Sequence, residues 1–304
     1  MKVLVATDKP FAKEAVDGIK QIIEKAGMEF ALLEKYTSQK ELCQAAKDVD
    51  AMIVRSDKVT QEVIDAAENL KIVVRAGAGY DNLDLQACCG RKIVAMNTPG
   101  QNSNAVAELA IAMMIFMARG QFTPAAGSEI KDKTLGIHAY GNVGSLVANY
   151  GKAFGMKVYA FDPYANPAAL KNDGVEQVST VEELYEKSNF VSLHIPSTPQ
   201  TKNSINKDLV GRMPKGAMVI NTARKDVINE AELLELIKQR EDLKYATDVA
   251  PDTDFSEVGN RFFATPKKMG AQTMEANVNA GLAAANQIVD FLQNGVNKFQ
   301  VNKF

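Results

Sequence analysis

Residues 135–144 read Leu135-Gly136-Ile137-His138-Ala139-Tyr140-Gly141-Asn142-Val143-Gly144, which is the pattern of a strand, a tight turn and the start of a helix. Gly141 would let the backbone approach a pyrophosphate closely, and Gly144 would let the helix pack on the strand. The first amides of the helix, at Asn142 and Val143, would then face the phosphates. The stretch predicts a dinucleotide site, although Ala139 stands at the first glycine of the fingerprint.

A carboxylate follows the next expected strand, which covers residues 157–161. Asp162 lies close to the offset of about 20 residues expected for the acidic group that binds the ribose hydroxyls. A carboxylate there would repel a 2′-phosphate, so the sequence favours NAD over NADP. The alternative is that Asp162 only caps a turn before Pro163.

Short β-branched runs alternate with amphipathic segments along the whole chain. This alternation predicts an α/β fold with parallel sheets covered on both faces, in two series that are similar folds in tandem. The expected strands are 3–6, 31–33, 51–54, 72–74 and 93–95 in the first series, and 135–139, 157–161, 190–194, 217–221 and 245–249 in the second. Long helices are expected at 11–26, 105–117 and 275–292.

The composition excludes several classes of protein. The 304 residues carry a net charge of −2, which gives no reason to expect a nucleic-acid partner. No apolar run approaches the length of about 20 residues that crosses a bilayer, and the N-terminus lacks a signal-peptide pattern. The three cysteines are too sparse for a disulfide framework, so a reduced, cytoplasmic location is expected. No metal site is predicted.

Six ordered segments resemble the D-2-hydroxyacid dehydrogenases, and within them the short, lysine-type D-3-phosphoglycerate dehydrogenases. They are Val74-Arg75-Ala76-Gly77-Ala78-Gly79-Tyr80-Asp81-Asn82, Asn97-Thr98-Pro99 through Asn102 to Glu108, Ser192-Leu193-His194-Ile195-Pro196, Ile220-Asn221-Thr222-Ala223-Arg224, Thr247-Asp248-Val249, and Ala264-Thr265-Pro266 through Gly270-Ala271. The likeness covers nearly the whole chain, and the order of the segments makes it far more specific than any single one.

The resemblance implies two Rossmann-like domains with an active-site cleft between them. Residues 1–98, completed by 278–304, would form a flavodoxin-like substrate domain, and 99–277 would form the NAD-binding domain. The helix expected at 105–117 resembles the family's dimer contact, so a homodimer is expected.

The resemblance also implies the substrate residues. Backbone amides at Gly77, Ala78 and Gly79 would hold the carboxylate of a 2-hydroxy acid, because small residues after a strand expose their N–H groups. Arg224 would bind the carboxylate and the reacting oxygen with its planar fork. A phosphorylated substrate would be bound by cations at two other strand ends. The residues implied there are Arg55, Ser56 and Arg75, with Asn102 beside the substrate; for Arg75 a structural ion pair is a serious alternative.

Further residues match the walls of the family's cofactor pocket. They are His194, Pro196, Thr201, Thr222, Ala223 and Asp248, the last of them near the nicotinamide amide. The alternative for Asp248 is a turn or capping role.

The acid–base group departs from the family pattern. Most relatives use a histidine paired with a glutamate, whereas the only histidines here, His138 and His194, lie in cofactor-domain motifs. Aligning backwards from Gly270 puts Lys268 at the histidine position, while aligning from Thr265-Pro266 favours Lys267. Thr253 stands at the glutamate position, flanked by Asp252 and Asp254. We expect Lys268 to transfer the proton, with an exposed lysine pair as the alternative.

Three functions follow for testing. The first is NAD-dependent oxidation of 3-phosphoglycerate, the opening step of phosphorylated serine biosynthesis. The second is reduction of glyoxylate, hydroxypyruvate or another unphosphorylated 2-oxo acid. The third, supported by the missing histidine and glutamate, is a catalytically silent NAD-binding protein like the corepressors that share this fold.

Overall fold

The computed structural model describes residues 1–304, which form two compact units. Unit 1 comprises Met1–Asn102 with Gln272–Phe304, and unit 2 is Ser103–Ala271. The boundaries expected from the sequence, 1–98 with 278–304 and 99–277, fall close to these. Each unit has its own sheet, and all pairings between its strands are parallel. The expected α/β fold with two Rossmann-like domains is therefore confirmed.

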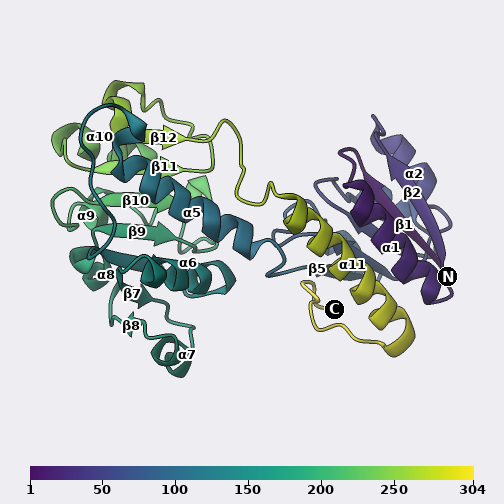
Figure 1. Cartoon of the computed structure of the whole chain (residues 1–304). Coiled ribbons are helices and arrows are strands. Elements are labelled where there is room, and N and C mark those ends of the chain that lie inside the picture. The colour runs from purple at the N-terminus through teal and green to yellow at the C-terminus, as the bar shows by residue number, and fades with distance from the viewer. The chain divides into compact units, whose positions relative to one another are not determined.

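Unit 1 is a five-stranded sheet in the order β2-β1-β3-β4-β5, which is the flavodoxin-like order. Its strands are β1 (Lys2–Thr7), β2 (Glu29–Glu34), β3 (Ala51–Val54), β4 (Ile72–Arg75) and β5 (Val94–Asn97). Its helices are α1 (Lys13–Lys25), α2 (Gln39–Ala46), α3 (Gln61–Ala66), α4 (Leu85–Gly90) and α11 (Met274–Asn294). Helices α1 and α11 pack side by side (Figure 1).

Alternation along each buried strand explains why unit 1 has helices on both faces. Val3 and Val5 point into a core shared with α1 and α11, whereas Leu4 and Ala6 point into a second core shared with α2, α3 and α4. The chain's end completes this unit, because Asn302 donates to the Ile93 carbonyl and accepts from the amide of Ala95.

Unit 2 is a seven-stranded sheet in the order β12-β11-β10-β9-β6-β7-β8. Its strands are β6 (Thr134–His138), β7 (Lys157–Phe161), β8 (Glu176–Gln177), β9 (Phe190–Leu193), β10 (Met218–Asn221), β11 (Lys244–Thr247) and β12 (Phe262–Ala264). Its helices are α5 (Ser103–Ala118), α6 (Asn142–Ala153), α7 (Pro167–Asn172), α8 (Val181–Lys187), α9 (Lys207–Val210) and α10 (Glu230–Gln239), with 3₁₀ turns at Gly120–Phe122, Lys225–Val227 and Ser256–Arg261. This is the dinucleotide-binding order extended by one strand.

Strand order reverses between β6 and β9, which are neighbours in the sheet although β7 and β8 lie between them in the chain (Figure 1). In an open parallel sheet, the loops at the carboxyl ends of the strands around such a point form the ligand site. Most candidate functional residues of unit 2 lie in or next to the loops that follow β6, β7, β9, β10, β11 and β12.

The sequence missed two strands, β8 and β12. Strand β8 has only two residues, both exposed, so it carries no hydrophobic pattern. Strand β12 is three residues long and only partly buried, at the edge of the sheet. None of the helices is both long enough and apolar enough to cross a bilayer.

Candidate active site

The turn after β6 keeps the dinucleotide-binding geometry despite its missing glycine. Ala139 adopts φ +80°, a left-handed conformation that glycine usually provides. Gly144 is buried in the first turn of α6, where a Cβ atom would lie 2.2 Å from the Ala139 carbonyl oxygen and 2.9 Å from Ile137 Cγ2. Only glycine fits at that point, so the helix begins directly against the strand.

The start of α6 is open where a phosphate would approach. Gly141 is the N-cap residue, and a Cβ atom built on it meets nothing within 4 Å. Asn142 is exposed and Val143 half-buried at the first two helical positions. Their backbone N–H groups have no partner within the helix, so the helix start offers donors and a favourable dipole to an anion.

Asp162, which follows β7, is bonded to the same turn. Its Oδ2 accepts from the amide of Tyr140 at 2.7 Å, and its Oδ1 accepts from the amide of Tyr164 at 2.8 Å. The capping role is therefore real. It does not exclude a ribose role, because each carboxylate oxygen has a second lone pair for a hydroxyl donor.

Four buried polar atoms at the carboxyl ends of β9, β10 and β11 have no hydrogen-bond partner. They are Ser192 Oγ, His194 Nε2, Thr222 Oγ1 and Asp248 Oδ1. Such orphaned groups are costly in a protein interior and are usually satisfied by a ligand or by water. Together with the open helix start and Asp162, they fit a dinucleotide with its nicotinamide end near β10 and β11.

The remaining predicted cofactor residues shape the loop after β9. Thr201 Oγ1 donates to the carbonyl oxygen of Pro196 at 2.6 Å and accepts from the amide of Thr198 at 2.8 Å. Burial lowers the pKa of His194 to about 3 and that of His138 to about 4. Both imidazoles are therefore neutral at physiological pH, and neither is placed as the missing acid–base histidine.

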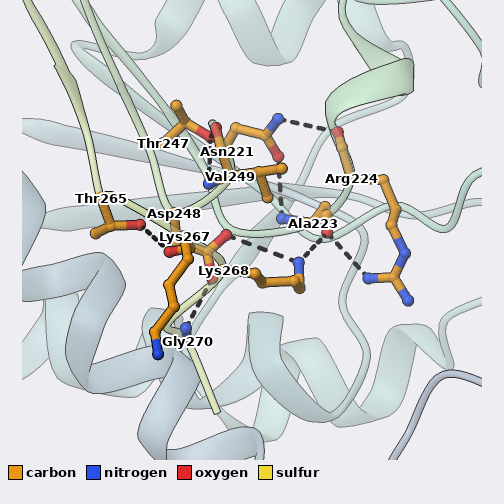
Figure 2. Close-up of polar contacts among 10 residues, drawn as sticks. All are labelled: Asn221, Ala223, Arg224, Thr247, Asp248, Val249, Thr265, Lys267, Lys268 and Gly270. Atoms are coloured by element: carbon orange, nitrogen blue, oxygen red, sulfur yellow. Dashed lines mark hydrogen bonds and ion pairs between the residues drawn. The ribbon is translucent and has the colours of Figure 1, made fainter. Parts of the chain in front are cut away.

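Two cations share one backbone oxygen at the carboxyl end of β10 (Figure 2). The carbonyl oxygen of Ala223 accepts from Arg224 Nη1 at 3.0 Å and from Lys268 Nζ at 2.8 Å. The amine of Lys267 takes part in none of these contacts, and its backbone carbonyl accepts from Thr265 Oγ1 at 2.7 Å. The structure thus brings Lys268, rather than Lys267, beside Arg224.

A carboxylate lies next to this pair. Asp248 is fully buried; its Oδ2 accepts from the amide of Gly270 at 2.8 Å, and its Oδ1 lies 3.7 Å from Lys268 Nζ. Burial is the main cause that lowers the pKa of Lys268, assisted by Arg224 and opposed by Asp248. Burial likewise raises the pKa of Asp248, with Lys268 and Arg224 opposing it.

None of the carboxylates around the missing glutamate position is bonded to the lysine. Asp252 is paired with Lys225 at 2.7 Å, and Asp254 accepts from the amide and hydroxyl of Ser256. The Thr253 amide, like that of Asp252, donates to Glu230 Oε2 at 2.9 Å. Sequence reasoning missed Glu230, which holds this loop from the start of α10.

Unit 1 contains a second group of predicted residues, at the carboxyl ends of β3 and β4. The guanidinium of Arg55 donates to the carbonyl oxygens of Lys9 and Pro10, each at 3.2 Å, and to Asn277 Oδ1 at 2.5 Å. It also lies 5.0 Å from the centre of the Phe11 ring. All these hydrogen-bond partners are uncharged. Burial lowers the pKa of Arg55, and the nearby carboxylates of Asp57 and Asp8 oppose that shift.

Arg75 contacts both Arg55, at the end of β3, and Gly77, after β4. Arg75 Nε donates to the carbonyl oxygen of Arg55 at 2.9 Å, and its guanidinium covers Gly77, where a Cβ atom would lie 1.6 Å from Nη1. Gly77, Ala78 and Gly79 donate no backbone hydrogen bond. Ser56 is exposed and Asn102 half-buried. Of the expected anion-binding groups of unit 1, Arg55, Arg75 and Gly77 therefore adjoin one another.

Comparisons with known proteins show which sequences and structures this chain is similar to. The family described as "D-isomer specific 2-hydroxyacid dehydrogenase, NAD binding domain" matches residues 105–269. The chain is 35% identical to a D-3-phosphoglycerate dehydrogenase of Methanocaldococcus jannaschii over 99% of its own length and 59% of that protein's. It is 34% identical to a hydroxypyruvate reductase of Thermotoga maritima, over 93% of this chain and 96% of the relative.

A solved structure is also similar. The NAD⁺-bound 3-phosphoglycerate dehydrogenase of Entamoeba histolytica superposes with a TM-score of 0.90 at 51% identity, covering 100% of this chain and 99% of that one. By contrast, the chain spans less than two thirds of the length of several curated phosphoglycerate dehydrogenases, including 57% of that of Archaeoglobus fulgidus.

Proposed function

Because the chain belongs to the D-isomer specific 2-hydroxyacid dehydrogenase family, with its NAD-binding domain in unit 2, we propose that it oxidises 3-phosphoglycerate to 3-phosphohydroxypyruvate with NAD. The observation that carries the proposal is the pair of cations, Arg224 and Lys268, on the Ala223 carbonyl. This is a 2-hydroxy acid site in which a lysine stands for the usual histidine. In metabolism, the reaction would open phosphorylated serine biosynthesis.

Each candidate site residue of unit 2 has a chemical role in this proposal. Arg224 binds the substrate carboxylate and polarises the oxygen on the adjacent carbon, because its planar fork matches both. Lys268 in its neutral form takes the hydroxyl proton during oxidation, and as an ammonium ion it returns that proton during reduction. Bound NAD supplies the hydride acceptor. The amides of Asn142 and Val143 would hold its pyrophosphate, and Asp162 would hold its ribose.

The lowered pKa of Lys268 is consistent with a base role in oxidation. An ordinary lysine titrates near pH ~10.4 and would be almost fully protonated at neutral pH. Burial and the adjacent Arg224 both disfavour the ammonium form of Lys268. We therefore expect the oxidation rate to rise with pH and the reduction rate to fall over the same interval.

The groups of unit 1 favour a phosphorylated substrate. Arg55 is a partly buried cation whose hydrogen bonds go to uncharged acceptors; Asp57 and Asp8 are near it without forming an ion pair, so its remaining N–H donors are available to an anion. The unbonded amides of Gly77, Ala78 and Gly79 suit a second anionic group, the carboxylate. A substrate with an anion at each end matches this set better than glyoxylate, which has one.

The test is NADH formation followed by absorbance at alkaline pH, with 3-phosphoglycerate against a panel of unphosphorylated 2-hydroxy acids. The proposal expects 3-phosphoglycerate to be turned over with a kcat/KM at least about tenfold above that of any other acid. Turnover of only the unphosphorylated acids would overturn the choice of substrate. Absence of turnover in both directions, with NAD still bound, would overturn catalysis itself.

A second candidate is reduction of hydroxypyruvate. It is favoured by the similarity to the hydroxypyruvate reductase of T. maritima, which this chain matches along nearly the relative's whole length. Arg224 and Lys268 would have the same roles, but Arg55 and Arg75 would have no substrate role. We further propose that the protein acts as a homodimer through α5, a long apolar helix whose Asn104, Glu108 and Ala112 are exposed.

A further inference from the structure

The missing glutamate leaves open which group holds the acid–base residue in place. In a histidine-type site the glutamate orients the ring and stabilises its charged form, and a lysine needs an equivalent even though it has no second nitrogen. Three carboxylates lie near Thr253, which stands at the glutamate position of the family: Asp252, Asp254 and Glu230. Each has another partner, namely Lys225 for Asp252, Ser256 for Asp254 and the backbone amides of residues 252 and 253 for Glu230.

We propose that Asp248, from the loop after β11, is the ion-pair partner that positions Lys268 for proton transfer. The inference rests on the proposed function, because it assigns a task to Lys268 within that reaction. Asp248 would thus serve both the nicotinamide end of the cofactor and the lysine. In proton transfer it is a positioning residue, because there it acts on the substrate only through Lys268.

The geometry of Asp248 carries the inference. Its Oδ2 is fixed by the Gly270 amide at 2.8 Å, and the side chain has no exposed surface. Its Oδ1 has no hydrogen-bond partner, and Lys268 Nζ lies 3.7 Å from it (Figure 2). A buried carboxylate with one oxygen anchored and the other open toward an amine is expected to fix that amine's position.

Gly270 is needed for this arrangement. A Cβ atom at residue 270 would lie 2.6 Å from Asp248 Oδ2, which is closer than any ordinary contact. Only glycine lets the backbone amide approach the carboxylate in this way. Gly270 therefore fixes the position of the Asp248 carboxylate, and that carboxylate fixes the position of the Lys268 amine.

The balance of charge around Lys268 defines the expected effect. The charged groups that face its amine are Asp248 from the loop after β11 and Arg224 from the loop after β10. Asp248 stabilises the ammonium form and Arg224 destabilises it. During oxidation the amine accepts the hydroxyl proton, so the ion pair with Asp248 strengthens as that proton arrives. Removing the negative charge must therefore favour the neutral amine.

The experiment compares Asp248→Asn with Asp252→Asn. The asparagine at 248 can still accept from the Gly270 amide, while Asp252→Asn removes an exposed carboxylate near the vacant glutamate position. We expect Asp248→Asn to move the rising limb of kcat for 3-phosphoglycerate oxidation to lower pH by about one to three pH units, the usual effect of one close charge. We expect Asp252→Asn to leave that limb unchanged.

A direct readout does not need turnover. The rate at which acetic anhydride acylates Lys268 in the cofactor-free protein, followed by mass spectrometry across pH, reports how much of the amine is neutral. Its midpoint should shift downward in Asp248→Asn, in step with the kinetic limb. A lower kcat with unmoved midpoints would show that Asp248 is merely structural and would overturn the proposal. A shift in Asp252→Asn instead would assign the role to Asp252.

A second variant protects the test against misfolding of Asp248→Asn. Lys268→Gln alters the more exposed member of the pair, whose side chain is 48% exposed. Because coupling is reciprocal, the pKa of the Asp248 carboxyl, read by ¹³C NMR of labelled aspartate, should be higher in Lys268→Gln than in the wild type. An unchanged Asp248 pKa would overturn the proposal. If the wild type does not turn over 3-phosphoglycerate, the proposed function fails, while acylation and NMR still decide the role of Asp248.

Discussion

Replacing Arg55 by methionine should abolish the preference for a phosphorylated substrate. Methionine keeps an unbranched apolar stem against the Phe11 ring but has none of the five N–H donors of arginine. The carbonyl groups of Lys9 and Pro10, which lose their donor, belong to exposed residues and can bond to water instead. We therefore expect the variant to fold normally.

The size of the effect follows from counting donors. Three of the five N–H donors of Arg55 are taken by Lys9, Pro10 and Asn277, which leaves two for a phosphate. Two hydrogen bonds to a charged group are worth about 3–6 kcal/mol at ~1.5–3 kcal/mol each. Since 1.4 kcal/mol is a factor of about ten, kcat/KM for the phosphorylated substrate should fall by about 10²–10⁴-fold.

The assay is NADH oxidation with 3-phosphohydroxypyruvate and, separately, with hydroxypyruvate. The ratio of the two kcat/KM values should collapse in Arg55→Met, while hydroxypyruvate reduction changes by less than about threefold. Arg91→Met is the matched control, because Arg91 also binds backbone carbonyls in unit 1, at the end of α3 and just after it, and should leave the ratio unchanged. If Arg55→Met slows both substrates equally, Arg55 does not recognise phosphate.

Three further changes test the positions around these sites. Asn277→Ala removes one hydrogen-bond partner that holds the Arg55 side chain in place. Ordering one long side chain costs about 0.5–1.5 kcal/mol, so KM for phosphorylated substrates should rise by about two- to tenfold with kcat unchanged. Initial rates at varied substrate concentration test this, and a fall in kcat alone would contradict it. Gly144→Ala places a Cβ 2.2 Å from the Ala139 oxygen and should destabilise unit 2 by about 1–3 kcal/mol; an unchanged melting temperature would show that the turn tolerates it. Asp162→Ala removes the charge that repels a 2′-phosphate, so the ratio of the affinities for NAD and NADP should fall at least about tenfold when both are measured by calorimetry. An unchanged ratio would show that Asp162 only caps the turn.

The sheet core was predictable from sequence because strands buried on both faces are nearly continuous apolar runs. The bounds expected for β3 and β7 coincide with the structure, and β10 begins one residue later than expected. Arg224 and Asp248 were singled out by the family resemblance and not by the strand pattern, because the strand expected at 245–249 included Asp248, whereas β11 ends at Thr247. A strand as short and exposed as β8 cannot be found from the hydrophobic pattern of the sequence.

Contacts between distant residues could not be predicted. Asn277 and Arg55 are 222 residues apart, and nothing around Asn277 in the sequence marks it as a partner of an arginine. The choice between Lys267 and Lys268 depended on an alignment gap, and only the direction of the two side chains separates them geometrically (Figure 2). Ala139 shows a third limit, because an alanine at φ +80° is held by its surroundings rather than by its own preference.

The most direct test of the account is the single-turnover rate of 3-phosphoglycerate oxidation in Lys268→Gln and Lys267→Gln at saturating NAD. If Lys268 transfers the proton, Lys268→Gln should lose about 10²–10⁴-fold in rate, as expected for loss of a general acid–base group. The amine of Lys267 has no contact with Ala223 or Asp248, so Lys267→Gln should keep the wild-type rate. Full activity in Lys268→Gln, or the large loss in Lys267→Gln instead, would contradict the assignment of Lys268.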